Sequence, residues 1–177
     1  MESFMTDHQS MNNDFALAGE QLFQFAIDRG EMKTILDALP LEVSEKRVAL
    51  EYEIQILRII SVGWAIAYFL ADSGRKTALG QHFWENVRAF SATLSTSASL
   101  TVGSRIDYFD ILKQRLNHYV GALDAAGKIP EPAMAIGPAF ADVCGNKDDA
   151  VAMLAGSKMF AHTIDAVRQY LDGNAAP

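Results

Sequence analysis

The feature that most constrains the fold is one long apolar helix expected over residues 44–71. Its apolar residues recur at helical spacing, and no charged residue occurs over the roughly thirteen positions from Ile59 to Ala71. Such a stretch has no polar face to turn toward water, so other helices must surround it. It is shorter than the roughly twenty apolar residues that a membrane-spanning helix needs. We therefore expect this helix to be the axis of a bundle.

The rest of the chain shows the same periodicity, and alternating strand-like runs between hairpin turns are absent. Apolar stripes and cap residues predict further helices that begin near Asn13, near Met32, before Leu79, after Ser104 and at Asn146. The short helix around Met32 should stop at Pro40. Three prolines in the segment 127–146 predict two short helical pieces, with Pro132 and Pro138 in their first turns.

These elements predict an all-α fold, a single-domain helical bundle of about six or seven helices around the central apolar helix. A chain of 177 residues fits one domain, and no linker is visible. We expect residues 1–11 to form a flexible N-terminal tail, because they are polar and acidic and have none of the features of a secretory signal. The helical domain should cover 12–173, with a flexible C-terminal tail over 174–177.

A run of serines and threonines over residues 91–103 follows the helix that begins before Leu79. Ser and Thr compete for backbone hydrogen bonds and are mediocre helix formers. The run is compatible with a fraying helix end, a loop, or a close-packed seam of small side chains. We expect the fraying end.

The charge balance excludes one class of partner. The net charge is −7, and the fifteen Lys and Arg residues are scattered along the chain. Because duplex binding relies on a basic patch, we expect no nucleic acid partner. The single cysteine, Cys144, cannot form an internal disulfide, which predicts a cytoplasmic location. We expect Cys144 to be a small buried apolar residue; the alternative is a thiol acidified by the nearby helix start.

No motif identifies a reaction, so the catalytic residues are unknown, and no metal and no cofactor are predicted. The sequence has no nucleophile elbow and no phosphate-binding loop. His82 and Glu85 share one side of a helix, but the apolar stripe of that helix directs Glu85 away from the core and leaves His82 at its flank. A solvated polar face explains this pair better than a metal site.

Two groups of residues are candidates for a ligand site. Glu53 shares a helix face with Leu57 and Trp64, opposite Arg58, and a carboxylate on an apolar face is costly unless it is paired or protonated. The alternative is a structural pairing with a nearby Lys or Arg. Aromatic residues could line a pocket for a planar ligand between helices. The candidate ligand-binding residues are Glu53, Trp64, Tyr68, His82 and Trp84.

A second set of residues lies off the main apolar stripes of its helices and predicts contact surfaces. Trp84 lies about a right angle from the stripe of Phe83, so either another helix or a partner must cover it. Aromatic residues and methionine are favoured at the centres of interfaces. The candidate interface residues are Trp84, Tyr108, Ile111, Met159 and Tyr170.

The sequence therefore favours a non-catalytic α-helical protein that forms a homo-oligomer or binds a protein partner through these secondary stripes. One alternative is a ligand-binding or metal-assisted enzyme with a pocket near Glu53. A second alternative is peripheral membrane association through the central helix, although we do not expect a membrane partner.

Overall fold

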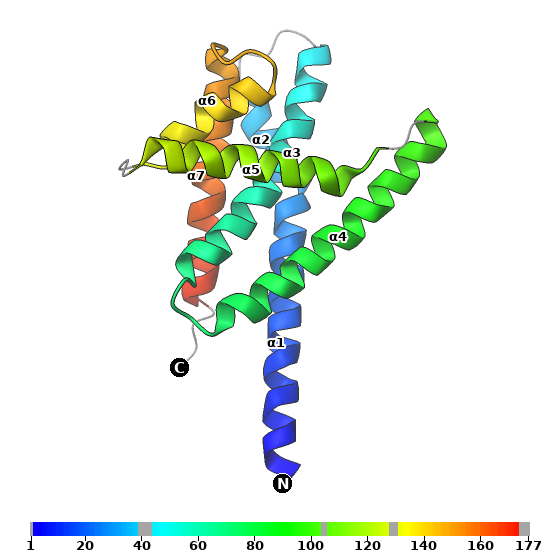
Figure 1. The fold of residues 1–177 in the computed structure, drawn as a ribbon, viewed down its shortest axis with the longest axis vertical. Coiled ribbons are helices and arrows are strands. Elements are labelled where there is room, and N and C mark those ends of the chain that lie inside the picture. The colour runs from blue at the N-terminus through cyan, green and yellow to red at the C-terminus, as the bar shows by residue number, and fades with distance from the viewer. Residues whose placement is uncertain (1, 39–43, 104–105, 128–130, 174–177) are drawn as a thin grey trace.

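Our computed structural model describes residues 2–38, 44–103, 106–127 and 131–173. Over these ranges the chain is all helical, without strands, and its helices are α1 (Glu2–Ile27), α2 (Arg29–Asp37), α3 (Ser44–Phe69), α4 (Arg75–Val102), α5 (Tyr108–Ala126), α6 (Ala133–Val143) and α7 (Ala150–Gly173) (Figure 1). The predicted stop at Pro40, the start at Ser104 and the tail over 174–177 lie outside the described residues.

The predicted axis is α3, and it contacts every other described helix. Its interior positions from Ile54 to Ile66 are almost all buried, because apolar residues occupy every side of the helix there. The all-α bundle around a central apolar helix is thus confirmed. The expectation of complete cover was wrong at the end of α3, where Tyr68 is 61% exposed. No helix in the described part of the chain is both long enough and apolar enough to span a bilayer.

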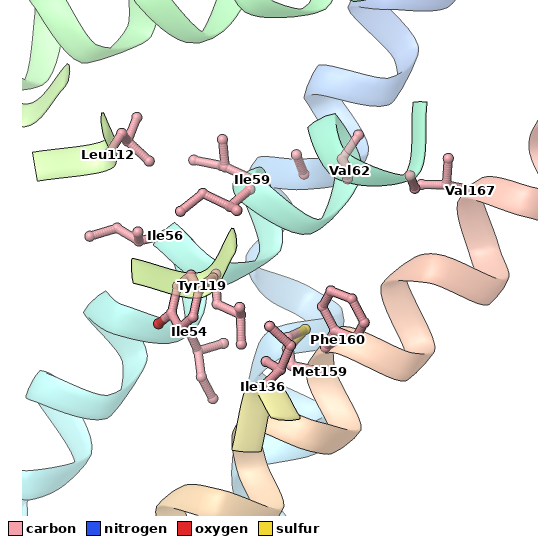
Figure 2. Close-up of a cluster of buried hydrophobic side chains, with 14 of the residues drawn as sticks. Ile54, Ile56, Ile59, Val62, Leu112, Tyr119, Ile136, Met159, Phe160 and Val167 are labelled. Carbon is pink, nitrogen blue, oxygen red and sulfur yellow. The ribbon is translucent and has the colours of Figure 1, made fainter. Parts of the chain in front are cut away.

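The centre of the core is a layer of side chains from four helices. Figure 2 shows Ile56 and Ile59 of α3 near Leu112 of α5, while Ile136 of α6 and Met159 of α7 approach α3 from the other end of the view. All five side chains are almost completely buried. Burial at this level stabilises the fold by about 1.5–3 kcal/mol for each large apolar side chain.

Glycines allow the helices to approach α3 and one another closely. A Cβ atom at Gly63 would overlap the ring of Trp84, and one at Gly156 would overlap Phe140. Trp84 therefore packs against α3 of its own chain. Of the two predicted ways to cover Trp84, another helix or a partner, the structure shows another helix. These contacts fix the positions of α4 and α6 against the bundle.

Two helices begin at residues other than those predicted. The backbone of α1 is helical from Glu2, so the start near Asn13 was wrong. The last helix starts at Ala150 and not at Asn146, because Asp149 supplies the cap: its Oδ1 atom accepts from the amides of Val151 (3.0 Å) and Ala152 (3.1 Å).

The segment 127–146 forms one described helix, α6, and not two short pieces. Pro138 lies inside this helix, where it removes the hydrogen bond to the carbonyl of Met134. Both residues are exposed, so water can solvate that carbonyl. The proline is tolerated for this reason.

The Ser/Thr run also remains helical, since α4 continues to Val102. Its hydroxyls bond back to carbonyls one turn earlier, as Ser91 does to Val87 (2.7 Å) and Thr96 to Ala92 (2.9 Å). The helix ends at Gly103, whose φ of 69° and amide bond to Ser99 form a C-terminal cap. The expected fraying end was wrong because the hydroxyls are satisfied within the helix.

Two helical segments project beyond the rest of the bundle. Figure 1 shows the first turns of α1 extending away at the N-terminus and the last turns of α4 extending away on another side of the molecule. We call residues 2–12 the α1 arm and residues 92–102 the α4 arm.

Candidate functional site

Glu53, the first candidate, is buried at 8% exposure and forms a two-pronged ion pair across the bundle. Its two carboxylate oxygens accept from Arg115 of α5, Oε2 from Nε at 3.0 Å and Oε1 from Nη2 at 2.8 Å. This pairing raises the pKa of Arg115, chiefly through the hydrogen bonds to Glu53. Glu53 is therefore held by the structural pairing that formed the alternative expectation, and a role in ligand binding stays a prediction.

Two groups near this ion pair, Tyr119 and Cys144, are neutral near physiological pH. Burial, with the negative charge of Glu53 as a smaller cause, raises the pKa of Tyr119 above its ordinary range. Cys144 was expected to be buried, but the residue is exposed. Protein atoms nevertheless crowd its thiol, and together with the charges of Glu53 and Asp149 they raise its pKa to about 12. The alternative of an acidified thiol is thus wrong, because the pKa of Cys144 is raised and not lowered.

A second buried charge fastens α2 to the bundle. Arg58 is completely buried, so its predicted place on the outer face of α3 was wrong. Its guanidinium donates to the carbonyl of Asp28 at 2.7 Å and to Glu31 Oε2 at 2.5 Å, and it lies 4.3 Å from the ring centre of Phe25. His162 of α7 reaches the same Glu31 oxygen at 3.5 Å. These contacts join four helices, α1, α2, α3 and α7, which indicates a structural role.

The aromatic candidates do not form one pocket with Glu53. Trp64 stacks on Tyr68 with ring centres 4.6 Å apart. Along the α3 axis, Trp64 lies about 16 Å and Tyr68 about 22 Å further than Glu53. His82 is a surface neighbour of Glu85 at 3.7 Å, as predicted. No three His, Cys, Asp or Glu residues of the described ranges are grouped so that they could hold a metal ion.

The predicted interface residues are mostly occupied within the chain. Tyr108 and Met159 are buried, so their assignment to an outer face was wrong. Tyr108 is enclosed from two sides because its ring meets those of Phe90 of α4 and Tyr52 of α3. Ile111 is partly buried against the core. Tyr170 donates a 2.6 Å hydrogen bond to Gln21 of α1.

A different surface, the groove between the α4 arm and the start of α5, is an open hollow beside exposed apolar side chains. Its volume is about 700 Å³, and it is more open than enclosed. Leu100, at 83% exposure, and Ile106, at 37%, lie on it. We call this surface the α4–α5 groove; it is lined by Arg88, Ser91, Ala92, Ser95, Thr96, Ser99, Leu100, Ile106, Asp107, Phe109 and Lys113.

Hydrogen bonds hold the two walls of the groove in place. The Ser95 hydroxyl accepts from the amide of Tyr108 at 3.0 Å and donates to the carbonyl of Ser91 at 2.8 Å. Asp107 caps α5 by accepting from the amide of Asp110 at 3.0 Å. The start of α5 is thereby fixed against α4, so the groove exists before any partner binds.

Two cations flank one aromatic ring in the groove. The guanidinium carbon of Arg88 lies 5.2 Å from the ring centre of Phe109, and the Lys113 ammonium lies 5.8 Å from it. Lys113 also pairs with Asp110 at 3.1 Å, and this contact contributes to lowering the pKa of that carboxyl. Among the described residues Arg88 forms no ion pair, so its charge is available to an incoming carboxylate.

The sequence did not single out this groove. The alternative of a seam of small side chains over 91–103 pointed toward it, and an isolated leucine within a Ser/Thr run was the remaining signal. Arg88 and Phe109 lie far apart in the chain, and only the angle between α4 and α5 brings them together.

Comparison with known proteins does not assign the chain to a family. No family model matches the chain, no curated protein matches its sequence, and no solved structure matches its fold.

Proposed function

We propose that this protein is a non-catalytic helical interaction protein and that its binding surface is the α4–α5 groove. The observation that carries the proposal is the combination in one open groove of a highly exposed leucine with two cations around Phe109. Exposed apolar side chains beside polar rims are typical of protein-binding surfaces. The polar candidate Glu53 already pairs with Arg115 of its own chain, and the buried guanidinium of Arg58 also has its acceptors there.

The chemistry of the groove favours one kind of occupant. The hydroxyls of Ser91, Ser95 and Thr96 in the groove donate to carbonyls of α4 itself. A ligand in the groove therefore needs to supply few hydrogen bonds to them. Amphipathic helices bind such grooves with side chains one turn apart. The flanking cations select acidic residues beside the apolar stripe. We infer that the occupant is an acidic amphipathic helix of a protein.

Photo-crosslinking in the native cells tests this proposal. A benzophenone side chain would replace Thr96, which is exposed and lines the groove, or, as the matched control, the exposed Leu154 of α7. We expect an adduct from position 96 at a yield several times that from position 154. Mass spectrometry should place the crosslink on an acidic amphipathic segment.

Two results would contradict the proposal. One is an equal yield from both positions, and the other is a crosslinked peptide that lacks either acidic residues or an apolar repeat at helical spacing.

A further inference from the structure

The partner of the groove can be identified more closely from the chain itself, on the assumption that the proposed function holds. The α1 arm carries Glu2 and Asp7 and no Lys or Arg, and Asp14 follows it. In the sequence, Phe4 and Met11 precede Phe15 at helical spacing. The backbone of this segment is helical from Glu2. It therefore has the chemistry that the groove selects.

As a helix, the α1 arm of residues 2–12 spans about 16 Å, which is three turns. In Figure 1 the α1 arm and the α4 arm extend from different sides of the molecule, far from each other. The arm of one chain cannot enter its own groove unless α1 breaks, so the occupant must come from another molecule.

Symmetry makes a second copy the natural source. If the α1 arm of each copy binds the groove of the other, both arms are covered at once and the assembly closes as a dimer. The charges agree with this arrangement: at a net charge of −7 two copies repel each other, and Arg88 and Lys113 provide positive charge where the acidic arm would lie. We propose that the protein forms a symmetric dimer in which the α1 arms and α4–α5 grooves are exchanged between copies.

Charge reversal on each side of the contact, measured by sedimentation equilibrium across the micromolar range, tests the dimer. The groove variant is R88E/K113E and the arm variant is E2K/D7K. Each should raise the dimer dissociation constant about tenfold or more, because each places like charges together. The control K147E/K158E changes two exposed lysines outside the groove, gives the same net charge as the groove variant, and should dimerise like the natural protein.

Mixing the two variants gives the decisive result. In the mixed dimer an acidic groove meets a basic arm and a basic groove meets an acidic arm, so both contacts are attractive. We expect the 1:1 mixture to form heterodimers with an affinity close to that of the natural dimer. A full-length natural chain that sediments as a monomer, a control that dissociates as readily as the groove variant, or a mixture that stays monomeric would each overturn the exchanged dimer.

The proposed function can survive such a failure. The full-length chain could be monomeric while position 96 crosslinks to an acidic helix of another protein. The groove would then be a binding surface, and only the proposal that a second copy occupies it would be wrong. If position 96 gives no specific adduct, the proposal that the groove is a binding surface is wrong.

Discussion

The bundle around α3 and the α4 arm differ in how their polar groups are satisfied. In the bundle, buried charges meet across helices, as Glu53 does with Arg115 and Arg58 with Glu31. In the α4 arm, hydroxyls bond to their own helix and leave the side chains around them uncovered. The first arrangement needs the whole fold to be assembled, whereas the second is complete within one helix. Stability should therefore depend on the bundle, and binding should depend on the arms.

Removing one half of a buried ion pair should have the largest effect on stability. Glu53→Leu leaves the partly buried Arg115 without its acceptor and should lower the free energy of unfolding by about 3 kcal/mol or more. The double variant E53L/R115M should recover most of the loss, because a well-packed apolar pair replaces the ion pair. Urea denaturation measures both.

The matched control for this pair lies on the surface. Asp37 and Arg47 form an exposed ion pair, and Asp37→Asn should leave the unfolding midpoint unchanged. If Glu53→Leu were as stable as the natural protein, the bundle would not depend on its crossed charges and the comparison would fail.

A smaller loss is expected where α4 touches α3. Gly63→Ala would drive a methyl group into the ring of Trp84 and should cost about 1–3 kcal/mol. Gly121→Ala in α5 is the control, because no atom lies within 4 Å of the added methyl group and alanine favours helix. Thermal unfolding should move the two midpoints in opposite directions. Equal midpoints would show that the α3–α4 contact is loose.

The third effect is a gradual loss of stability at alkaline pH. The pKa of Cys144 is raised from 9.0 to about 12 in the folded protein, and those of Tyr108 and Tyr119 are raised above their ordinary value of 10.0. The unfolded chain therefore releases these protons first, so stability is complete below about pH 9 and falls as pH rises toward about pH 12.

Urea midpoints at a series of pH values would measure this loss. In Cys144→Ser the fall between about pH 9 and about pH 10 should be shallower, because only the tyrosines remain and their ordinary pKa is 10.0. An identical curve would mean that the folded protein does not hold the thiol neutral.

The smallest effect on stability should come from the arm. Leu100→Ser removes a side chain that is 83% exposed, and the free energy of unfolding should change by less than about 0.5 kcal/mol. The same variant should weaken association in sedimentation equilibrium. A large loss of stability would show that Leu100 belongs to the core, and unchanged association would remove it from the interface.

The parts of the fold that follow from local pattern could be predicted from sequence. The absence of charge from Ile59 to Ala71 was enough to identify α3 as the axis, because no other placement hides such a helix. Glu53 on an apolar face predicted either a site or a partner, but its partner Arg115 is 62 residues away in the chain and could not be named.

The rest depends on contacts between helices. Helical spacing assigns each residue to a face relative to one apolar stripe. Tyr108 lies off the stripe of α5 and was therefore predicted to be exposed, but α5 has neighbours on two sides and Tyr108 is buried between them. The continuation of α4 through its serines depends on hydroxyls that bond to the same helix, which a propensity scale counts as unfavourable. The groove is formed by the angle between α4 and α5, which the sequence pattern of either helix does not give.

The buried guanidinium of Arg58 has a consequence for the cooperativity of folding. Helix α2 has nine residues, too few to be stable alone. It carries Glu31, and its cap residue Asp28 supplies the carbonyl, so both acceptors for Arg58 leave if α2 detaches. A permanently charged group would then remain in the core without acceptors. We therefore expect α2, the shortest described helix, to detach less readily than its length alone would predict.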